Sequence, residues 1–468
     1  MADASEADIR TEIAPLFRDD EGHLNAAYLE AVQAAIVSED RAALEELTEG
    51  LHEVDVGELL TALTPELRLG YIEILGDEFD YTALTELDEA IRLQILENLP
   101  PHTVANGLAA LDSDDAVYIL EDLEEDEKQA ILARLPFAKR HRLARSLDYP
   151  EETAGRRMQS DFVALPPFWS VGQVIDALRE EDDLPDSFYQ IFVVDPAFRL
   201  LGTVSLDRLL RTPRPTRISE IMNETPHTVL ATEDQEEVAR VFQRYNLVSA
   251  AVVDESDRLV GVLTIDDIVD IIEEEAEEDI RYLTGAGDAE LSDTVYYTAR
   301  TRIPWLLINM ATAFLAASVI GLFDGTIQQM VALAILMPIV ASIGGNAGIQ
   351  AMTVTVRALA AKSISTRNTA RVIGREILVA LANGTIVAVV VGLIAGLWFQ
   401  NPELGGVIAT ALVFNVLCAG FFGVVTPIVL DKLGADPAVA SSVFLTTLTD
   451  VIGFLAFLGL AAWWFGIY

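Results

Sequence analysis

Asp450 is the first residue of chemical interest, because it is an acidic side chain inside an apolar stretch. Residues 443–465 contain no Lys, no Arg and no second acid, so an ionised carboxylate there is costly unless it is hydrated or paired. Ser442 and Thr446 precede it by two turns and by one turn of a helix. We expect this polar face to line a cavity or an ion path. A protonated Asp450 that hydrogen-bonds a neighbouring helix is the alternative.

A second polar segment lies in another apolar stretch, where residues 344–348 read Gly-Gly-Asn-Ala-Gly and follow Pro338. Glycine lets helices approach closely, and proline leaves a carbonyl without its helical partner. Exposed backbone at membrane depth is tolerated only where it is buried in protein or lines water. Asn346 offers a neutral oxygen and Asp450 a charged one, and a hydrated Mg²⁺ suits such a site. The two segments predict a cation pathway, although glycines alone are also typical of close packing.

A run of acidic residues occupies positions 266–279, with Ile and Val at helical intervals among them. Pairs such as Asp266/Asp270 and Asp270/Glu274 are four residues apart, where like charges cost about a few tenths of a kcal/mol. No Lys or Arg occurs from Asp266 to the residue before Arg281. A divalent cation with oxygen ligands would relieve the repulsion. We interpret the run as a cation sensor, and a merely solvated acidic face is the alternative.

Charge divides the chain of 468 residues into two parts. Residues 296–468 hold six acidic and eight basic residues, whereas residues 1–295 hold the other 67 acids and 23 bases. The acidic part excludes a general nucleic-acid binder, which needs basic patches. Five scattered His and one Cys give no zinc spacing, and no nucleophile–base pair or P-loop stands out. We therefore expect no enzyme.

Five apolar stretches are long enough to cross a bilayer, which takes about 20 residues. They are residues 303–323, 329–358, 372–399, 405–430 and 439–465. Basic residues precede the first stretch and gather in the second and fourth connections, whereas Asp324 and Glu403 lie in the first and third. Because Lys and Arg favour the cytoplasmic side, we expect the acidic part inside and the C-terminus outside.

Two repeats organise the acidic part. Leucine recurs every 12 residues from Leu51 to Leu147, and Leu or Ile stands nine residues after each of the first seven. Such a unit is a helix of about two turns with a connection, often opened by polar or Pro residues such as Thr64-Pro65 and Asp88. It cannot bury its face alone, so the units must stack as a superhelical solenoid. This solenoid is either a scaffold or a docking surface for a cation.

The second repeat is a doublet. Residues 191–210 and 250–269 share seven identical positions at an offset of 59, and each predicts strand, turn, strand and helix. Here the sequence resembles the CBS (cystathionine β-synthase) fold. The resemblance implies a tandem α+β pair, which in many families binds adenine nucleotides.

The whole architecture resembles the MgtE family of magnesium channels and transporters, which is related to eukaryotic magnesium solute carriers. The resemblance covers the chain from about residue 30 to the end. It rests on the segments 149–155 (Tyr-Pro-Glu-Glu-Thr-Ala-Gly), 259–267, 344–348 with 357–360, 433–437 and 448–450.

This resemblance implies a homodimer with the pore at the subunit interface, where Asp450 is the principal ligand and Asn346 lies near it. Cytosolic Mg²⁺ would bridge the N domain, the CBS pair and a connecting "plug" helix and hold the pore closed. The matching sensor positions are Asp267, Asp270, Glu275, Glu278 and Asp279, and ATP binds the CBS pair in some members. This sequence departs from the family pattern at two places: residue 349 is Ile within Gly-Ile-Gln, and residues 442–443 are Ser-Val where Asn-Pro is usual. These departures affect how the ion would be coordinated in detail and which divalent ion would be selected.

We therefore predict a multidomain protein: an all-α superhelical N domain, an α+β tandem CBS pair and an α-helical membrane domain of five transmembrane helices. The expected parts are an N-terminal segment (1–30), the helical solenoid (31–152), the CBS pair (153–272), the acidic plug helix (273–300) and the transmembrane pore domain (301–468). The predicted function is Mg²⁺ import across the cell (inner) membrane by a lipid-embedded homodimer, closed by cytosolic Mg²⁺. Two alternatives stay open. One is a Co²⁺ or Ni²⁺ transporter, which the lack of His and Cys ligands disfavours; the other is a membrane-anchored cation or nucleotide sensor without transport.

Overall fold

The computed structural model describes residues 16–181, 184–185, 187–284, 294–364, 368–435, 437 and 441–466. The chain divides into two compact units, Met1–Ile272 and Glu273–Tyr468. The boundary falls inside one helix, α15 (Ile265–Thr284). The predicted segment 273–300 therefore contains the end of α15, nine residues outside the description, and the start of the next helix.

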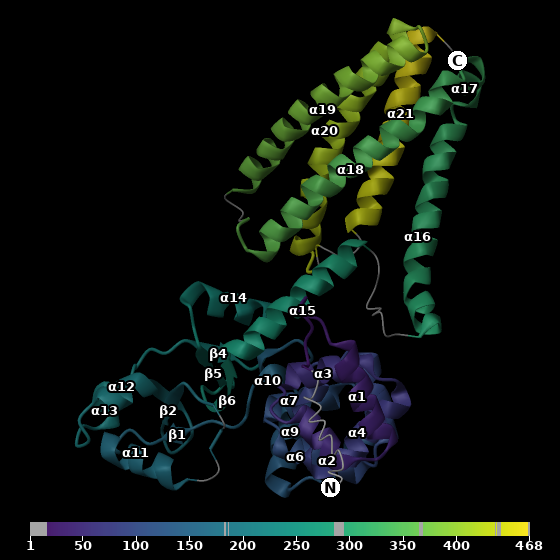
Figure 1. Cartoon of the computed structure of the whole chain (residues 1–468). Coiled ribbons are helices and arrows are strands. Elements are labelled where there is room, and N and C mark those ends of the chain that lie inside the picture. Colours follow the sequence, from purple (N-terminus) through teal and green to yellow (C-terminus); the bar gives the residue numbers. More distant parts are fainter. Residues whose placement is uncertain are drawn as a thin grey trace, which may run out of the picture. The chain divides into compact units, whose positions relative to one another are not determined.

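The first unit begins with a stack of short helices (Figure 1). They are α1 (Ala26–Val37), α2 (Arg41–Thr48), α3 (Glu53–Ala62), α4 (Pro65–Leu75), α5 (Glu89–Asn98), α6 (Pro101–Ala110), α7 (Ser113–Glu121), α8 (Glu125–Leu132) and α9 (Phe137–Leu147). From α3 onward the helices begin at positions 12 residues apart, with one unit missing between α4 and α5. The leucines at the ends of the units are buried from Leu63 to Leu135. The helical solenoid predicted from the 12-residue period is confirmed.

The missing unit, between α4 and α5, is built differently. Two 3₁₀ turns, η1 (Gly76–Glu78) and η2 (Tyr81–Leu84), replace the α-helix. The guanidinium of Arg92 lies buried below this stretch, where it donates to the Leu87 carbonyl at 2.9 Å and to Asp122 at 2.7 Å. The 12-residue spacing is therefore kept by leucine burial even where the helix is lost. The helix starts expected at Thr64-Pro65 and Asp88 are confirmed, since Thr64 and Asp88 stand at the N-cap positions of α4 and α5. Their side chains, however, form no capping hydrogen bond with the helix.

The CBS doublet forms two sheets of the same design. Strands β1 (Ala164–Leu165), β2 (Gln190–Val194) and β3 (Leu200–Ser205) make one sheet; β4 (Thr228–Leu230), β5 (Ser249–Val253) and β6 (Leu259–Thr264) make the other. In each, the first pair is parallel and the second antiparallel, with a bulge at the same place. The helices of the pair are α10 (Ala154–Arg157), α11 (Val171–Glu180), α12 (Leu206–Arg211), α13 (Ile218–Ile221) and α14 (Gln235–Tyr245). The α+β duplication is confirmed.

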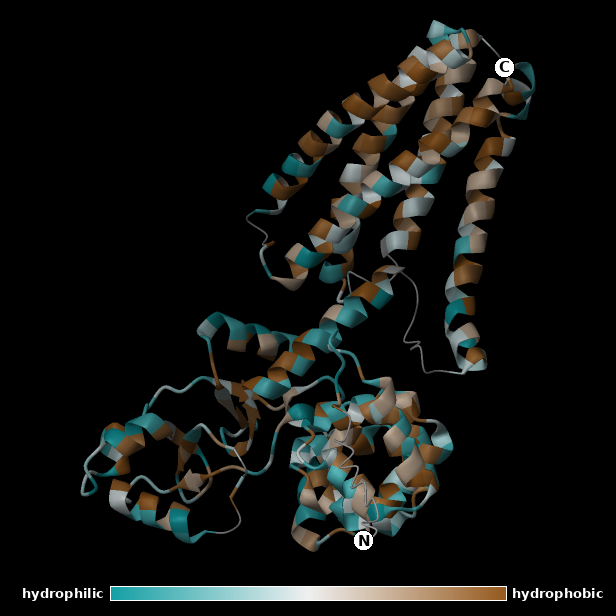
Figure 2. Ribbon diagram, in the orientation of Figure 1, coloured by the Kyte–Doolittle hydropathy of each residue, from teal (hydrophilic) through white to brown (hydrophobic). Residues whose placement is uncertain are grey.

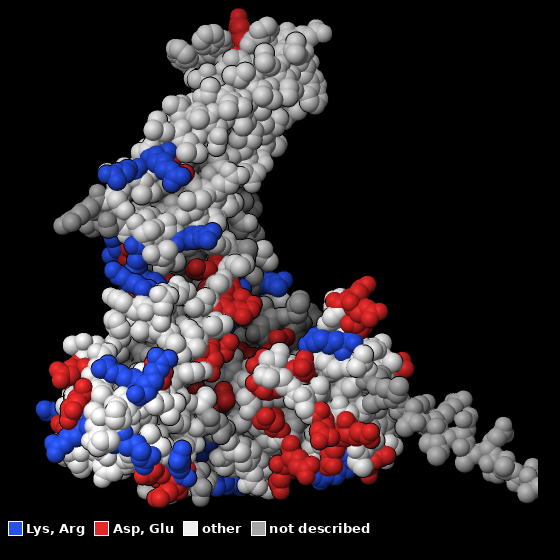
Figure 3. Space-filling view, turned by 60° about the vertical axis from the view of Figure 1, so that its left-hand side comes forward, with Lys and Arg blue, Asp and Glu red and all other residues white. Residues whose placement is uncertain are grey.

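The second unit is a bundle of long apolar helices (Figure 2). They are α16 (Val295–Gly321), α18 (Ala332–Ala360), α19 (Thr369–Trp398), α20 (Pro402–Lys432) and α21 (Ser441–Phe465), with the short α17 (Asp324–Gln329) after α16. Five of them are long and apolar enough to cross a membrane, as predicted. Figure 3 shows few charged side chains on most of this bundle, whereas the first unit carries many, both acidic and basic, on the face in view. The second unit is that of a multi-pass membrane protein.

Helix α20 lies centrally in the bundle and packs against α18, α19 and α21. The last turns of α15 also belong to this unit, because Tyr282 and Leu283 pack against a cluster of Met352, Val356 and Leu445. At its other end α15 buries Ile268 and Ile271 in the core of the second CBS repeat. One continuous helix thus starts in the CBS core and ends among the membrane helices.

Candidate functional site

Two aspartates from distant parts of the sequence lie next to each other in the first unit. Asp114 lies in the first turn of α7, and Asp267 in the first turn of α15. The backbone N–H and the hydroxyl of Thr264 also donate to Asp267 Oδ2, at 3.1 and 2.6 Å. Burial, together with the charge of Asp267, raises the pKa of Asp114 well above its usual range. Burial raises the pKa of Asp267 to about 6, against the effect of Thr264. The pair favours one shared proton over two negative charges.

Further carboxyl groups surround this pair, and we call the whole set the acidic junction. Burial, and then the charge of Asp267, raises the pKa of Asp115 to about 7. Burial, and then the charge of Asp270, raises the pKa of Glu86. The members of the acidic junction are Asp80, Glu86, Asp112, Asp114, Asp115, Asp267 and Asp270. The charged neighbours that act most strongly on Asp114 and Asp115 are all aspartates, so the negative charge is poorly compensated.

One cation of the N domain lies at the edge of the junction. Lys139 of α9 donates to the carbonyls of Ala109, at 3.0 Å, and of Leu111. Burial lowers the pKa of its ammonium, while Asp161, Asp112 and Asp114 act in the opposite direction. In the described part of the chain, no three acidic, His or Cys side chains are already arranged to hold a metal ion. Mg²⁺ usually keeps several waters and binds through one or two carboxylates, so the junction fits that ion without a complete shell.

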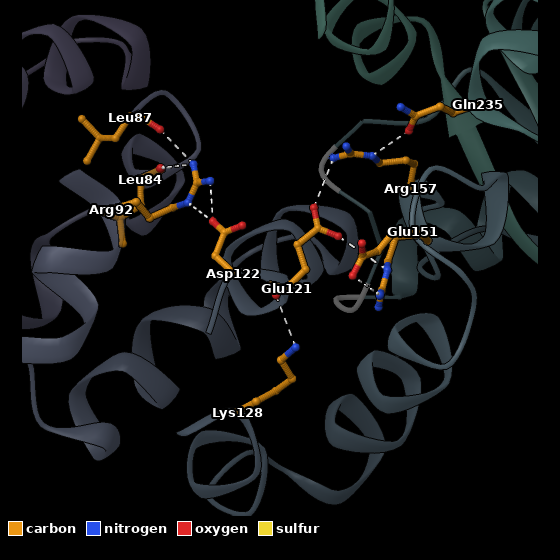
Figure 4. A network of polar contacts seen from close by, with 10 residues as sticks. Leu84, Leu87, Arg92, Glu121, Asp122, Lys128, Glu151, Arg157 and Gln235 are labelled. Atoms are coloured by element: carbon orange, nitrogen blue, oxygen red, sulfur yellow. Dashed lines mark hydrogen bonds and ion pairs between the residues drawn. The ribbon is translucent and has the colours of Figure 1, made fainter. Parts of the chain in front are cut away.

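A second set of contacts holds α7 against the CBS pair (Figure 4). Both carboxylate oxygens of Glu121 form ion pairs at 3.5 Å, one with Arg156 and one with Arg157. Arg157 also donates to Gln235 at the start of α14, at 3.1 Å. Because α7 carries Asp114 and α14 belongs to the second CBS repeat, this network positions the two sides of the acidic junction.

The predicted sensor residues fall into two groups. Asp267 and Asp270 lie in the acidic junction, as described above. Glu275, Glu278 and Asp279 lie farther along α15, in the second unit, and begin about 12 Å beyond Asp267 at the rise of an α-helix. Sequence reasoning missed the N-domain members Asp80, Glu86, Asp112, Asp114 and Asp115. Three acids within four residues (112–115) exceed what one helix cap needs, and that excess was a usable signal.

In the membrane unit, Asp450 is half-buried on α21 and forms no hydrogen bond or ion pair with another described residue. One turn earlier, the hydroxyl of Thr446 donates to the carbonyls of Ser442 and Val443, at 3.0 and 3.1 Å. Its methyl group faces α18, since a Cβ at Gly345 would lie 3.9 Å from Thr446 Cγ2. At Thr446, α21 therefore passes close to Gly345 of α18.

Asn346 lies one position beyond Gly345, about 100° around the helix. It lines a groove of about 590 Å³ between α18, α19 and α20, together with Gln350, Glu376 and Asn383. The residue that the structure brings next to Thr446 is thus Gly345, and Asn346 lies with the polar side chains of α19.

Sequence reasoning also missed Asn415 of α20. Its side chain is fully buried, and Nδ2 donates to the Val340 carbonyl at 3.0 Å. A Cβ at Gly344 would lie 2.1 Å from Asn415 Nδ2, and one at Gly453 would lie 2.6 Å from it. Two glycines, on α18 and α21, thus make room for one amide, which fixes how these helices meet.

Comparison with known proteins agrees with this arrangement. Family models match residues 51–152 (the MgtE intracellular N domain), 154–214 and 218–274 (CBS domain), and 337–460 (MgtE, divalent cation transporter). The magnesium transporter MgtE of Thermus thermophilus is 33% identical over 464 residues, covering 92% of this chain and 97% of the relative. The magnesium transporter MgtE of Bacillus subtilis is 28% identical, and the match covers 88% of this chain and 91% of the relative. Among solved structures, one match is the crystal structure of the cytosolic domain of the Mg²⁺ channel MgtE in complex with ATP. The sequence identity is 32%, the match covers 52% of this chain and 99% of the solved chain, and the TM-score is 0.49. The chain belongs to the MgtE family.

Proposed function

We propose that this protein imports Mg²⁺ across the cell membrane through a path that passes Asp450. The observation that carries the proposal is a half-buried carboxylate on an apolar helix, without a partner among the described residues. A packing residue would need a donor there, whereas an ion path needs a hydrated oxygen. A single carboxylate with hydroxyls nearby suits an ion that keeps its water. The relatives named above, both called magnesium transporters, support Mg²⁺ as the cargo.

The gate is proposed to be the acidic junction acting through α15. With little cytosolic Mg²⁺, Asp114, Asp115 and Asp267 repel one another and the N domain separates from the CBS pair. Mg²⁺ between these carboxylates would neutralise the repulsion and draw α7 and α15 together. Because α15 ends on the membrane helices, its position can be passed to them. We propose that Glu275, Glu278 and Asp279 take part in the same response as further Mg²⁺-responsive positions on that helix.

The assembly is proposed to be a homodimer in the inner membrane, with the first unit in the cytoplasm and the C-terminus outside. The basic connections support this orientation. The membrane potential then drives entry, with about 4.6 kcal/mol for a divalent ion per 100 mV. ATP binding at the CBS pair remains a prediction from the family resemblance, and nothing in the gate requires it.

The test is Mg²⁺ flux into proteoliposomes, with the Mg²⁺ concentration on the first-unit side varied. Asp450→Asn is compared with the wild type, and Asp431→Asn, at the end of α20, is the matched control for a lost carboxylate. We expect flux that requires Asp450, tolerates loss of Asp431 and falls as Mg²⁺ on the first-unit side rises. Co²⁺ and Ni²⁺ are added as competitors to test the cargo.

Each outcome assigns the protein to one class. Flux of Co²⁺ or Ni²⁺ in preference to Mg²⁺ would contradict Mg²⁺ as the transported ion, while the proposed path past Asp450 would stand. Absence of any flux, in protein shown to be folded and dimeric, would contradict transport and favour a membrane-anchored sensor.

A further inference from the structure

Tyr118 of α7 contacts two guanidinium groups in the first unit. The Cζ atom of Arg92 is 4.5 Å from the centroid of the tyrosine ring, and that of Arg157 is 5.3 Å from it. Arg92 belongs to α5 of the N domain, whereas Arg157 ends α10 of the CBS pair. The ring of Tyr118 is therefore a place where a cation of the CBS pair meets the N domain.

Helix α10 moves with the second CBS repeat, because its backbone is bonded to that repeat. The N–H group of Ala154 donates to the Glu233 carbonyl, and the N–H group of Gly155 donates to the Ala231 carbonyl, both at 2.8 Å. Ala154 is also buried in the core of the second repeat. The position of Arg157 thus reports the position of that repeat.

Arg157 meets α7 at two side chains that lie one helical turn apart, Tyr118 and Glu121. Its Nη1 is 3.5 Å from Glu121 Oε1, and the side chains of this ion pair are only 18% and 16% exposed. Water screens such a pair less than it screens a surface pair, and an aromatic ring attracts a guanidinium more strongly where water is excluded. The contact between α7 and α10 therefore holds without a divalent ion.

We propose that Tyr118 is a positioning residue of the gate, which holds the guanidinium of Arg157 against Glu121 and thereby sets the Mg²⁺ concentration at which the gate closes. This inference rests on the gate described under the proposed function. Helix α7 carries Asp114, and the second CBS repeat leads directly into α15 with Asp267.

Separation of the N domain from the CBS pair must break the contact between α7 and Arg157. The contact therefore favours the closed arrangement at every Mg²⁺ concentration, and Mg²⁺ supplies only the remaining part of the closing free energy. A weaker contact leaves a larger part to Mg²⁺, so that closing needs a higher Mg²⁺ concentration.

The experiment uses full-length protein and two Mg²⁺ titrations, one of flux into proteoliposomes and one of the protection of α15 from proteolysis in detergent. The test variants are Tyr118→Leu, Tyr118→Phe, Arg157→Gln and the double variant of Tyr118→Leu with Arg157→Gln. The matched controls are Phe137→Leu and Arg140→Gln. Arg140 Cζ lies 5.6 Å from the centroid of the Phe137 ring, and both residues belong to α9, so this cation–π pair does not join two domains.

We expect Tyr118→Leu and Arg157→Gln each to raise the half-maximal Mg²⁺ concentration about three- to tenfold in both titrations, with flux at low Mg²⁺ unchanged. Tyr118→Phe keeps the aromatic ring and should stay within about twofold of the wild type, as should both controls. The double variant should shift the titration little further than either single variant, because both remove the same contact.

Several results would overturn the inference. An equal shift in Phe137→Leu, or shifts of Tyr118→Leu and Arg157→Gln that add fully, would show that Tyr118 acts on general stability. If Tyr118→Leu fails to fold, Arg157→Gln alone decides, and an unchanged titration then contradicts the assignment. A wild-type protein without any Mg²⁺ response would overturn the gate together with this inference, whereas a wild-type response that the folded variants leave unchanged would overturn this inference alone.

Discussion

Asp267 and Asp450 are both acidic residues on helices, but their surroundings are opposite. Asp267 lies next to Asp114 and among other carboxyl groups, all in a water-facing unit. Asp450 lies on a membrane helix with a threonine and a serine on its face and without a described partner. A group of carboxylates that repel one another gains much from a bound cation, whereas a single carboxylate gains little and releases the ion readily. The first arrangement suits a sensor and the second suits a path.

The two regions are also built from different kinds of elements. The acidic junction joins segments far apart in sequence, α7 and α15, so it can be closed and opened by a rigid movement of the N domain. The polar face of α21 is local, because Ser442, Thr446 and Asp450 follow one another on a single helix. A change at the junction should therefore alter regulation, and a change on α21 should alter throughput.

The largest effect is expected for Asp450→Asn. The change keeps the shape of the side chain and removes the charge, so flux should fall about a hundredfold, equivalent to about 3 kcal/mol in the barrier. Protection of α15 from proteolysis by Mg²⁺ should stay as in the wild type, because the acidic junction is intact. The measurement is flux into proteoliposomes with limited proteolysis of the same preparation. Loss of the Mg²⁺ response together with flux would show that the two regions are not separable.

The next largest effect is expected on inhibition by cytosolic Mg²⁺, when carboxyl groups of the acidic junction are removed from the N domain or from α15. Two multiple variants test it: Asp114→Asn with Asp115→Asn on the N-domain side, and Asp267→Asn with Asp270→Asn and Glu275→Gln on the α15 side. Each should transport normally but need about tenfold more cytosolic Mg²⁺ for half-inhibition, which is within the usual range of coupling between sites. Glu127→Gln on the exposed face of α8 is the control for a lost charge and should behave as the wild type. Combining both sets should add little, because each removes the same bridge. Inhibition at an unchanged Mg²⁺ concentration would contradict the assignment.

A smaller effect is expected from pH. Burial raises the pKa of Asp115 to about 7 and that of Asp267 to about 6, above their values of about 4 in an unfolded chain. The folded state therefore binds protons more tightly, and this stabilisation is complete below about pH 4 and is lost as pH rises through 6 to 7.

Without divalent ions, the melting temperature of the full-length protein should fall between pH 5 and pH 8, and Asp115→Asn should flatten that fall. Because protons compete with Mg²⁺ for the same carboxylates, the Mg²⁺ concentration for half-inhibition should decrease severalfold from pH 6 to pH 8. Stability that rises over this range in the wild type would contradict the raised pKa values.

The fold was predictable because its signals are repeats and lengths. The 12-residue leucine period, the duplicated strand–turn–strand segment and five long apolar stretches each report burial, which sequence patterns record well. The two 3₁₀ turns between α4 and α5 were not predictable in this way, since Leu75 and Leu87 keep the period while the helix between them is lost.

The candidate sites were predictable only in part, for a physical reason. Asp267, Asp270 and Asp450 stand out because of their immediate neighbours in sequence. The pKa of Asp114 and that of Asp115 are raised by burial and then by the charge of Asp267. Asp267 is more than 150 residues away, and the sequence does not record that approach. Asn346 lines the groove beside α19, and its expected place near Asp450 in the path stays a prediction.

The smallest functional effect is expected for Asn415, which sharpens the comparison from within the membrane unit. Unlike Asp450, this polar side chain has a partner, the Val340 carbonyl, and two glycines shaped around it. Asn415→Ala should leave flux and Mg²⁺ inhibition within about twofold of the wild type and lower stability by about 0.6–2 kcal/mol, the range for hydrogen bonds between membrane helices. Gly344→Ala alone should destabilise the protein more, because its Cβ would lie 2.1 Å from Asn415 Nδ2. Adding Asn415→Ala to Gly344→Ala should restore part of the lost stability. The stability changes are measured as unfolding midpoints in detergent, and Gly374→Ala, whose Cβ meets nothing within 4 Å, is the control. If Asn415→Ala instead abolished flux without lowering the midpoint, Asn415 would belong to the path and the contrast with Asp450 would fail.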